Sequence, residues 1–303
     1  MLATKSVVIS TSLFLAILLV SAFWYLSRNL TSYKNTNLGT EATFNFGVQG
    51  DSHPEREGKM FSPSLYTTTM QNVISYKPSL YFLMGDDFST EKLIDSNTVT
   101  QENVNQVYLT QKKYLDLLDK STSIYLVNGN HEQEAKYLLG QNPSPALLAD
   151  NARTTYFDSP GSKTGYYSVT KGEALFVVID FYWHSDTPVD NTAGAKNEDK
   201  KQRDLWNNTL GEEQYTWFKN TLESSTAKYK FVFTHHVLGT GRGGVEMAKL
   251  YEWGGYNQKG VWEFDKMRPG WELPIHQLMV KNKVTIFFQG HDHLFAKQEL
   301  DGV

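Results

Sequence analysis

Short apolar stretches recur along the chain from residue 43 onward, and polar residues follow each of them. The stretches are rich in aromatic and β-branched residues, which favour β-strands, and turn residues bound them. This pattern predicts strands over residues 43–49, 80–84, 124–127, 175–179, 230–233 and 284–288.

Between several of these stretches, apolar residues recur with the spacing of a helix. The spacing predicts helices around residues 104–118 and 215–222, and Pro274 is well placed to open a further short helix. Residues 186–208 are charged and polar, which predicts a long surface loop. Strands that alternate with helices indicate an α/β fold.

The N-terminus carries a different pattern, a charge-free apolar run over residues 7–26 that follows Lys5. A helix of this length spans about 30 Å, the thickness of a bilayer core. The run fits an uncleaved anchor, and Val20-Ser21-Ala22 also fits the cleavage site of a signal peptide. Either alternative predicts an extracytoplasmic protein, membrane-anchored or secreted. The predicted parts are a signal anchor or signal peptide (1–27), a polar linker (28–42) and one domain (43–303).

Composition narrows the function classes. The 303 residues carry a net charge of −4 with acidic and basic residues interspersed, so no surface for nucleic acid is evident. Cysteine is absent, which excludes disulfides and thiolate chemistry.

Residue types that bind metals follow five of the predicted strands, and ligands of open α/β sheets bind at the carboxyl ends of strands. Side chains at positions i and i+2 of a strand point the same way, so we expect each Asp-x-His or His-x-His pair to converge. A glycine before the ligands permits a sharp turn. The motifs are Gly50-Asp51-Ser52-His53, Gly85-Asp86, Gly129-Asn130-His131, His235 and Gly290-His291-Asp292-His293.

The candidate ligands combine oxygen and nitrogen donors without sulfur, a set that suits Mn, Fe, Zn or Co. Seven ligands exceed what one tetrahedral site takes, and a carboxylate can bridge two ions about 3.5–4 Å apart. Each motif alone is common by chance, as a turn or as a loop acid near a surface histidine. Their combination, each after a strand, predicts two bound metal ions. The seven residues are Asp51, His53, Asp86, Asn130, His235, His291 and His293.

With these motifs, residues 43–298 resemble the calcineurin-like metallophosphoesterase superfamily. The resemblance implies two mixed β-sheets packed as a sandwich and flanked by helices. It implies that His131 is the general acid beside the leaving group, and that His235 rather than His236 is a ligand. The implied ligands are Asp51, His53, Asp86 and His293 for the first metal, and Asp86, Asn130, His235 and His291 for the second.

The chain departs from the family pattern at three places. Purple acid phosphatases have a tyrosine three residues after the bridging aspartate, where this chain has Ser89, so an iron–tyrosinate site is not expected. Asp87 directly follows the bridging aspartate and has no assigned role. The chain also ends soon after His293, where family members usually add strands. One interpretation is a fragment with truncated C-terminal strands, in which Glu299-Leu300 begins a strand.

The function predicted by this resemblance is a metal-dependent phosphoesterase that hydrolyses phosphomonoesters or diesters. A hydroxide that bridges the two metal ions would attack phosphorus in line, and His131 would protonate the leaving group. The alternative is an extracytoplasmic module on the same fold that binds phosphate ligands or signals, with little turnover. An amidohydrolase barrel is disfavoured because it places His-x-His at its first strand rather than its last.

Residues 239–273 are unusual in holding eight glycines and three tryptophans between two of the motifs. They predict either a substrate lip or an aromatic loop packed on the domain itself. In a lip, Arg242 or Arg268 would contact the phosphate, and Asn130 is a further candidate for substrate binding.

Three other residues have candidate supporting roles. Glu132 is interpreted as a helix cap in preference to a residue that orients His131. Asp180 fits either a residue behind the ligands or a turn. His276 lies in the expected helix near Pro274 and is interpreted as structural.

Overall fold

The computed structural model describes residues 36–37, 43–133, 145–162, 165–180, 206, 209–235 and 243–303. The chain divides into two compact units, Met1–Thr36 and Asn37–Val303, and almost all described residues lie in the second. The predicted N-terminal helix, nearly all of the linker and most of the loop over residues 186–208 lie outside the described residues. Within the described ranges, no helix is long and apolar enough to cross a membrane.

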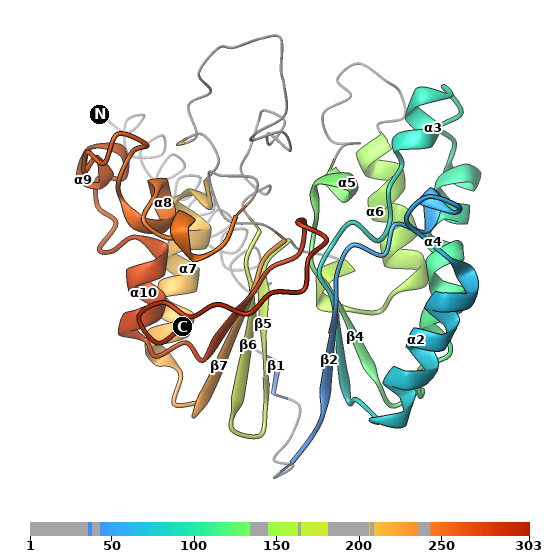
Figure 1. Cartoon of the computed structure of the whole chain (residues 1–303), viewed down its shortest axis with the longest axis horizontal. Helices are drawn as coiled ribbons and strands as arrows, with labels where there is room; N and C mark the ends of the chain where they lie inside the picture. The colour runs from blue at the N-terminus through green and yellow to red at the C-terminus, as the bar shows by residue number, and fades with distance from the viewer. Residues whose placement is uncertain are drawn as a thin grey trace, which may run out of the picture. The chain divides into compact units, whose positions relative to one another are not determined.

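Strands and helices alternate along the second unit (Figure 1). The strands are β1 (Thr36–Asn37), β2 (Phe46–Gln49), β3 (Leu80–Leu83), β4 (Ser123–Leu126), β5 (Tyr167–Lys171), β6 (Ala174–Val178), β7 (Tyr229–Phe233) and β8 (Ile286–Phe288). The α-helices are α2 (Pro63–Ser75), α3 (Glu91–Asp95), α4 (Gln101–Leu115), α5 (Asn130–Gln133), α6 (Pro145–Tyr156), α7 (Gly211–Ser224), α8 (Tyr251–Gly254), α9 (Phe264–Met267) and α10 (Ile275–Lys281). Short 3-10 helices are η1 (Pro54–Arg56), η3 (Pro160–Ser162) and η5 (Val245–Met247).

The strands form two sheets. The larger has the order β1-β5-β6-β7-β8, and the smaller has the order β2-β3-β4. Strands β2, β3 and β4 are parallel, as are β6, β7 and β8, whereas β5 pairs antiparallel with β6. The prediction of two mixed sheets is therefore wrong for the smaller sheet, whose described strands are all parallel.

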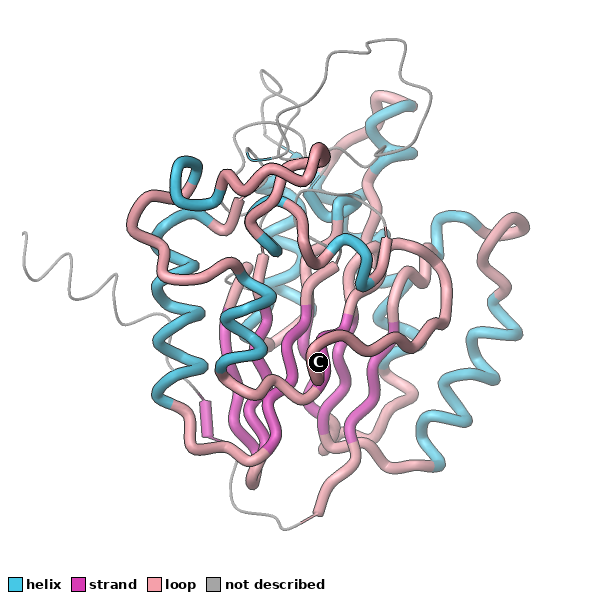
Figure 2. Tube along the Cα trace, turned by 60° about the vertical axis from the view of Figure 1, so that its left-hand side comes forward, coloured by secondary structure: helices cyan, strands magenta, loops and turns pink. Residues whose placement is uncertain are grey.

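Alternating side chains along each strand define three layers of core. In β3, Leu80 and Phe82 face the other sheet, while Tyr81 and Leu83 pack with the helices outside it. The ring of Phe82 stacks on Phe233 of β7 with centroids 4.3 Å apart, which joins the two sheets at their centre. Helices α2, α4 and α6 cover the smaller sheet, and α7, α8 and α10 cover the larger one (Figure 1). In Figure 2 the helices lie outside the strands of the two sheets.

Two of the helices that cover the smaller sheet begin at residues that cap them. The Ser62 hydroxyl accepts a hydrogen bond from the Leu65 N–H at 3.4 Å at the start of α2. Thr100 does the same for the Asn103 N–H at 3.2 Å at the start of α4. Such caps satisfy backbone donors that the first turn leaves unpaired, a gain of about 1 kcal/mol each.

All six predicted strands are present, and the three predicted helices correspond to α4, α7 and α10. Strand β5 was not predicted, although its alternating residues before the Gly172 turn carry a hairpin signal. The expectation that a strand begins at Glu299-Leu300 is wrong, because residues 289–303 form no strand. The coarse prediction of an α/β fold with two sheets between helices is confirmed.

Candidate metal centre

The candidate ligands lie in five loops that follow β2, β3, β4, β7 and β8, at the end of the sheets where the chain leaves the parallel strands (Figure 1). Backbone hydrogen bonds continue between neighbouring loops beyond the strands. The Asp51 N–H donates to the Gly85 carbonyl at 3.1 Å, and the Gly290 N–H donates to the His235 carbonyl at 2.7 Å. The sheet order therefore places residues from distant parts of the sequence at one position.

Most of the candidate ligands have a left-handed backbone conformation, which is rare and costs about 1–3 kcal/mol for a residue with a side chain. Asp51 and His53 converge as expected, but left-handed turns past the strand bring them together, and strand alternation does not. The expected convergence of His291 and His293 on one centre is wrong, because the two side chains join different clusters of candidate ligands. The φ angles are 52° for Asp51, 44° for His53, 58° for Asp86, 70° for His291 and 51° for His293.

Three candidate ligands, Asp86, His235 and His291, form a buried cluster that we term the inner group. His235 Nε2 lies 3.1 Å from Asp86 Oδ2, 3.1 Å from the Asn130 side-chain oxygen and 3.2 Å from His291 Nδ1. Ligands about 2.1 Å from one ion are separated by about 3.0–3.4 Å in octahedral and tetrahedral geometry. The inner group and Asn130 thus fit the coordination shell of one ion.

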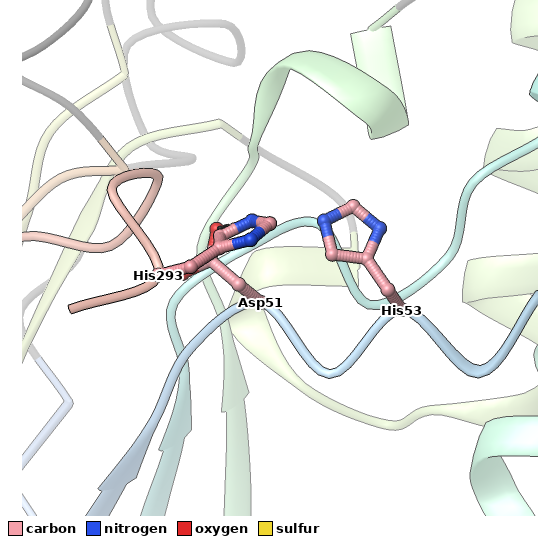
Figure 3. A group of neighbouring side chains, drawn as sticks. All are labelled: Asp51, His53 and His293. Atoms are coloured by element: carbon pink, nitrogen blue, oxygen red, sulfur yellow. Dashed lines mark ion pairs between the residues drawn. The ribbon is translucent and has the colours of Figure 1, made fainter. Parts of the chain in front are cut away.

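Asp51, His53 and His293 form a second cluster, the outer group (Figure 3). His293 Nε2 lies 3.5 Å from Asp51 Oδ1, and the His53 and His293 rings have centroids 5.0 Å apart. His53 Nε2 is buried without a hydrogen-bond partner and lies 3.7 Å from Asp86 Oδ2. A buried nitrogen of this kind is costly unless it binds something, so its environment fits a metal ligand.

Protein groups fix the orientation of the ligand side chains from behind. His235 Nδ1 is 2.8 Å from the Met84 carbonyl, and His53 Nδ1 is 2.8 Å from a Glu55 carboxylate oxygen. Partners of this kind set the tautomer and leave the other ring nitrogen for the ion.

Close backbone packing explains two of the glycines in the motifs. Gly85 has a φ of 97°, and a Cβ there would lie 2.5 Å from the Gly129 nitrogen. A Cβ on Gly129 would lie 2.3 Å from Asp86 Oδ1. The loops after β3 and β4 can approach this closely only because both positions are glycine.

Glu132 connects these same two loops, and its expected role as a helix cap is wrong. Its carboxylate accepts hydrogen bonds from the N–H groups of Asp86, Asp87 and Phe88 at 2.8–2.9 Å, and from that of Gly129 at 2.7 Å. Four bonds from backbone donors to one buried anion hold the loop that presents Asp86. The Gly129-Asn130-His131-Glu132 motif includes Glu132, but nothing in the sequence marks the backbone N–H groups that donate to it.

Asp87 lies on the far side of the Asp86 loop in a buried polar cluster. One of its carboxylate oxygens accepts hydrogen bonds from Ser52, Gln49 and Gln111, and burial raises its pKa well above the usual range. Asp87 therefore supports the loop and does not face the candidate ligands.

The charges of the cluster are strongly coupled in the metal-free protein. Burial raises the pKa of Asp51 to about 6. Burial alone would lower the pKa of His235, but the charge and hydrogen bond of Asp86 raise it to about 10. Although burial favours neutral Asp86, the His235 imidazolium holds the pKa of that carboxyl well below its usual range. A proton on His235 thus balances the carboxylates.

His131, the candidate proton donor, lies at the border of this cluster. Its Nε2 is 4.0 Å from Asp86 Oδ2 and 3.1 Å from Arg56 Nη2, and its Nδ1 is 3.4 Å from the Ser89 hydroxyl. Because a guanidinium can only donate, Nε2 accepts from Arg56 in this arrangement. Ser89, at the position of the purple acid phosphatase tyrosine, therefore lies beside His131.

The remaining sequence candidates are placed as follows. Arg242 and His236 lie outside the described residues. Asp180 accepts a hydrogen bond from the Asn128 amide at 2.8 Å, so it supports the loop that carries Asn130. His276 is structural as predicted, since it contacts Asp301 at 3.0 Å and stacks on Trp253.

The Arg268 side chain packs against the core between the larger sheet and the helices that cover it. Its guanidinium pairs with the buried Glu252 and donates to the Trp206 carbonyl, and it lies over the rings of Trp206 and Trp271. Of the two predicted alternatives, the described part of residues 239–273 forms the aromatic loop packed on the domain. Arg268 takes part in this packing.

Comparisons with known proteins give one family match. A comparison with curated proteins found no match. Among solved structures, the crystal structure of a dimetal phosphatase from Danio rerio is similar at 16% sequence identity and a TM-score of 0.41, covering 64% of this chain and 70% of that chain. A model of the calcineurin-like phosphoesterase family matches residues 44–295, a span that includes all seven candidate ligands. The chain belongs to the calcineurin-like phosphoesterase family.

Proposed function

We propose that this protein is a dinuclear metal-dependent phosphoesterase. The observation that carries the proposal is the position of Asp86 Oδ2, which lies 3.1 Å from His235 Nε2 and 3.7 Å from His53 Nε2. One carboxylate oxygen thus faces a nitrogen of the inner group and a nitrogen of the outer group, as a bridging ligand requires. Family membership supports metal-dependent phosphoester hydrolysis as the reaction class.

The two proposed metal positions share Asp86. Asp51, His53, Asp86 and His293 would hold the first ion, and Asp86, Asn130, His235 and His291 the second. Oxygen and nitrogen ligands of this kind favour Mn, Fe, Zn or Co. Bound metal would supply Lewis acidity, which polarises the phosphoryl group and activates water for in-line attack.

The protein's own residues would orient the phosphate and move the proton. The Asn130 side-chain oxygen lies 3.1 Å from His235 Nε2, beside the inner group, and the amide would also contact a phosphoryl oxygen. His131 Nε2 lies 4.0 Å from Asp86 Oδ2, which puts it within reach of an ester oxygen bound at the bridge. Protonation of the leaving group by a positioned histidine contributes about 10²–10⁴-fold.

The test compares leaving groups in the metal-loaded protein. We expect His131→Ala to cut turnover of an alkyl phosphate by about 10²–10⁴-fold, and that of a para-nitrophenyl ester much less, since para-nitrophenolate leaves without a proton. Metal content, measured by elemental analysis, should stay near that of the unmodified protein. Equal losses on both esters, with metal retained, would remove the proton-donor role.

The alternative is a binding or signalling module with little turnover, and the candidate ligand set does not favour it. All seven expected ligands are present, and six of them contribute to the inner and outer groups. A panel of mono- and diesters with Mn, Fe, Zn and Co separates the two functions. Tight phosphate binding without hydrolysis under every condition would favour the module.

Export from the cytoplasm stays a prediction, because residues 1–27 lie outside the described part of the chain. A reporter fused after residue 34 tests it. Reporter activity confined to the cytoplasm would contradict both the anchor and the signal peptide.

A further inference from the structure

An arginine that the motifs do not include lies next to the candidate proton donor. Arg56 Nη2 is 3.1 Å from His131 Nε2, and that nitrogen is 4.0 Å from Asp86 Oδ2. The guanidinium and the proposed bridging carboxylate thus both lie near the same imidazole nitrogen. Its side chain is 26% exposed, so solvent and small solutes can reach it.

The turn that presents His53 also fixes Arg56. The Arg56 N–H donates to the His53 carbonyl at 2.9 Å, within η1. The Arg56 carbonyl in turn accepts from the N–H groups of Lys59 and Met60 at 3.0 and 3.1 Å. A backbone held on both sides limits where the side chain can reach, so its position beside His131 is built into the loop.

Most of the hydrogen-bonding capacity of Arg56 is unused. A guanidinium has five N–H donors, and the His131 ring is the one contact at an ordinary hydrogen-bond distance. The other polar contacts are longer, at 3.4 Å to Glu55 Oε1, 3.5 Å to Glu91 Oε2 and 3.5 Å to Met60 Sδ. Strong arginine–carboxylate pairs are frequently bidentate, with two parallel bonds of about 2.7–2.9 Å, and Arg56 forms no such pair.

The neighbouring carboxylates do not compete strongly for this cation. Glu55 is committed to His53 Nδ1 at 2.8 Å, and the Glu91 side chain is 45% exposed, where screening weakens its attraction. Arg56 is thus a cation at the candidate site that retains the capacity to pair with a further anion.

We propose that Arg56 binds the free oxygens of a phosphomonoester, and that it biases the site toward monoesters over diesters. This inference rests on the proposed function and specifies its substrate class. A monoester dianion presents more charged oxygens than a diester, so one more of them is available to a guanidinium after others bind metal. When Arg56 turns to the phosphate, His131 Nε2 no longer accepts its hydrogen bond, so that nitrogen can take up a proton from water and pass it to the leaving oxygen.

The test uses Arg56→Gln and Arg56→Lys in the full-length metal-loaded protein, with Lys59→Ala as the matched control. Lys59 is an exposed cation in the same loop, three residues away. The first measurement is calorimetric binding of inorganic phosphate. We expect Arg56→Gln to weaken binding about 10–100-fold, the loss of one or two charged hydrogen bonds, with Arg56→Lys between it and the parent. Metal content should not change, and Lys59→Ala should bind as the parent does.

The second measurement compares para-nitrophenyl phosphate with bis(para-nitrophenyl) phosphate. Arg56→Gln should raise KM for the monoester and lower its kcat/KM at least about tenfold more than that of the diester. Unchanged phosphate binding, an equal effect of Lys59→Ala, or equal losses on both esters would overturn the role of Arg56. If the parent hydrolyses neither ester but Arg56→Gln still weakens phosphate binding, the phosphate contact stands and the proposed hydrolysis and monoester preference fail.

Discussion

The inner and outer groups differ in how completely the protein builds them. In the inner group, Asp86, His235 and His291 are 1%, 0% and 3% exposed, and their ligand atoms already have the spacing of a coordination shell. In the outer group, the His293 side chain is 29% exposed, and its Nε2 lies 3.5 Å from Asp51. If each group binds a metal ion as proposed, the protein preorganises the inner position and leaves the outer one for metal binding to complete.

The positions of the strands account for part of this difference, although His291 of the inner group also follows β8. His235 follows β7, which lies between β6 and β8, and its ring is fixed by the Met84 carbonyl at the end of β3. His293 follows β8, the terminal strand of the described sheet, and continues into residues that form no further strand. We therefore expect metal to fill the inner position first and to exchange more readily at the outer one.

Asp86→Asn should have the largest effect, because it removes the charge that both groups share. The loss of bound metal would remove several kcal/mol of transition-state stabilisation, which corresponds to a fall in turnover of about 10³-fold or more. Elemental analysis after reconstitution should show both metals depleted. Asp95→Asn, at the exposed end of α3, is the control. Two ions retained in Asp86→Asn would refute a shared ligand.

His235→Ala and His293→Ala separate the two groups directly. Removal of His235 should abolish activity on every ester, and added metal should not restore it, because the inner group loses its central nitrogen. His293→Ala should lose one ion at low metal concentration and recover activity when metal is in excess. Metal titrations followed by activity and elemental analysis make the comparison. Equal rescue of both variants would mean that the two positions are equally preorganised.

Glu132→Gln tests what makes the inner group rigid. An amide offers one acceptor oxygen and turns an N–H₂ group toward backbone donors, so some of the four hydrogen bonds to Asp86, Asp87, Phe88 and Gly129 are lost. We expect the free energy of unfolding to fall by about 1.5–3 kcal/mol and metal affinity by about 10–100-fold. Urea unfolding of the metal-free protein measures the first, with Glu102→Gln on α4 as the control. A stability equal to that of the control would show that the loops after β3 and β4 keep their conformation without the Glu132 hydrogen bonds.

The sequence predicts which residues form the site better than it predicts how the backbone brings them together. Strand patterns and short motifs placed Asp51, Asp86 and His235 at one edge of the sheets, because parallel strands end together. Strand alternation did not explain the convergence of the ligands, since the left-handed φ of His53 or His291 depends on tertiary packing. Such turns cannot be predicted from the pattern of apolar and polar residues.

Supporting residues were harder to predict for a related reason. Glu132 acts on backbone N–H groups of a loop 44–46 positions earlier, and no side-chain pattern marks those donors. Arg56 lies in a short 3-10 turn without periodicity, so only its contact with His131 distinguishes it from a surface cation. Strand β5 carries a hairpin signal in its alternating residues and the Gly172-Glu173 turn, so its omission is an error of interpretation and not a limit of the sequence.

Proton release on metal binding should give the smallest and most specific difference between the groups. In the metal-free protein the pKa of His235 is raised to about 10, so this inner residue is protonated throughout the neutral range, whereas the pKa of Asp51 in the outer group is raised to about 6. A metal ion must displace these protons, and so raising the pH strengthens binding. Near pH 7.5 we expect His235 to release about one proton, and near pH 5 we expect a larger release that includes one proton from Asp51.

Calorimetry in buffers of different ionisation enthalpy counts the protons. Asp51→Asn should lower the release near pH 5 by about one proton and leave that near pH 7.5 unchanged. The same count at both pH values in the parent protein would contradict the raised pKa of Asp51, and no release near pH 7.5 would contradict a protonated His235.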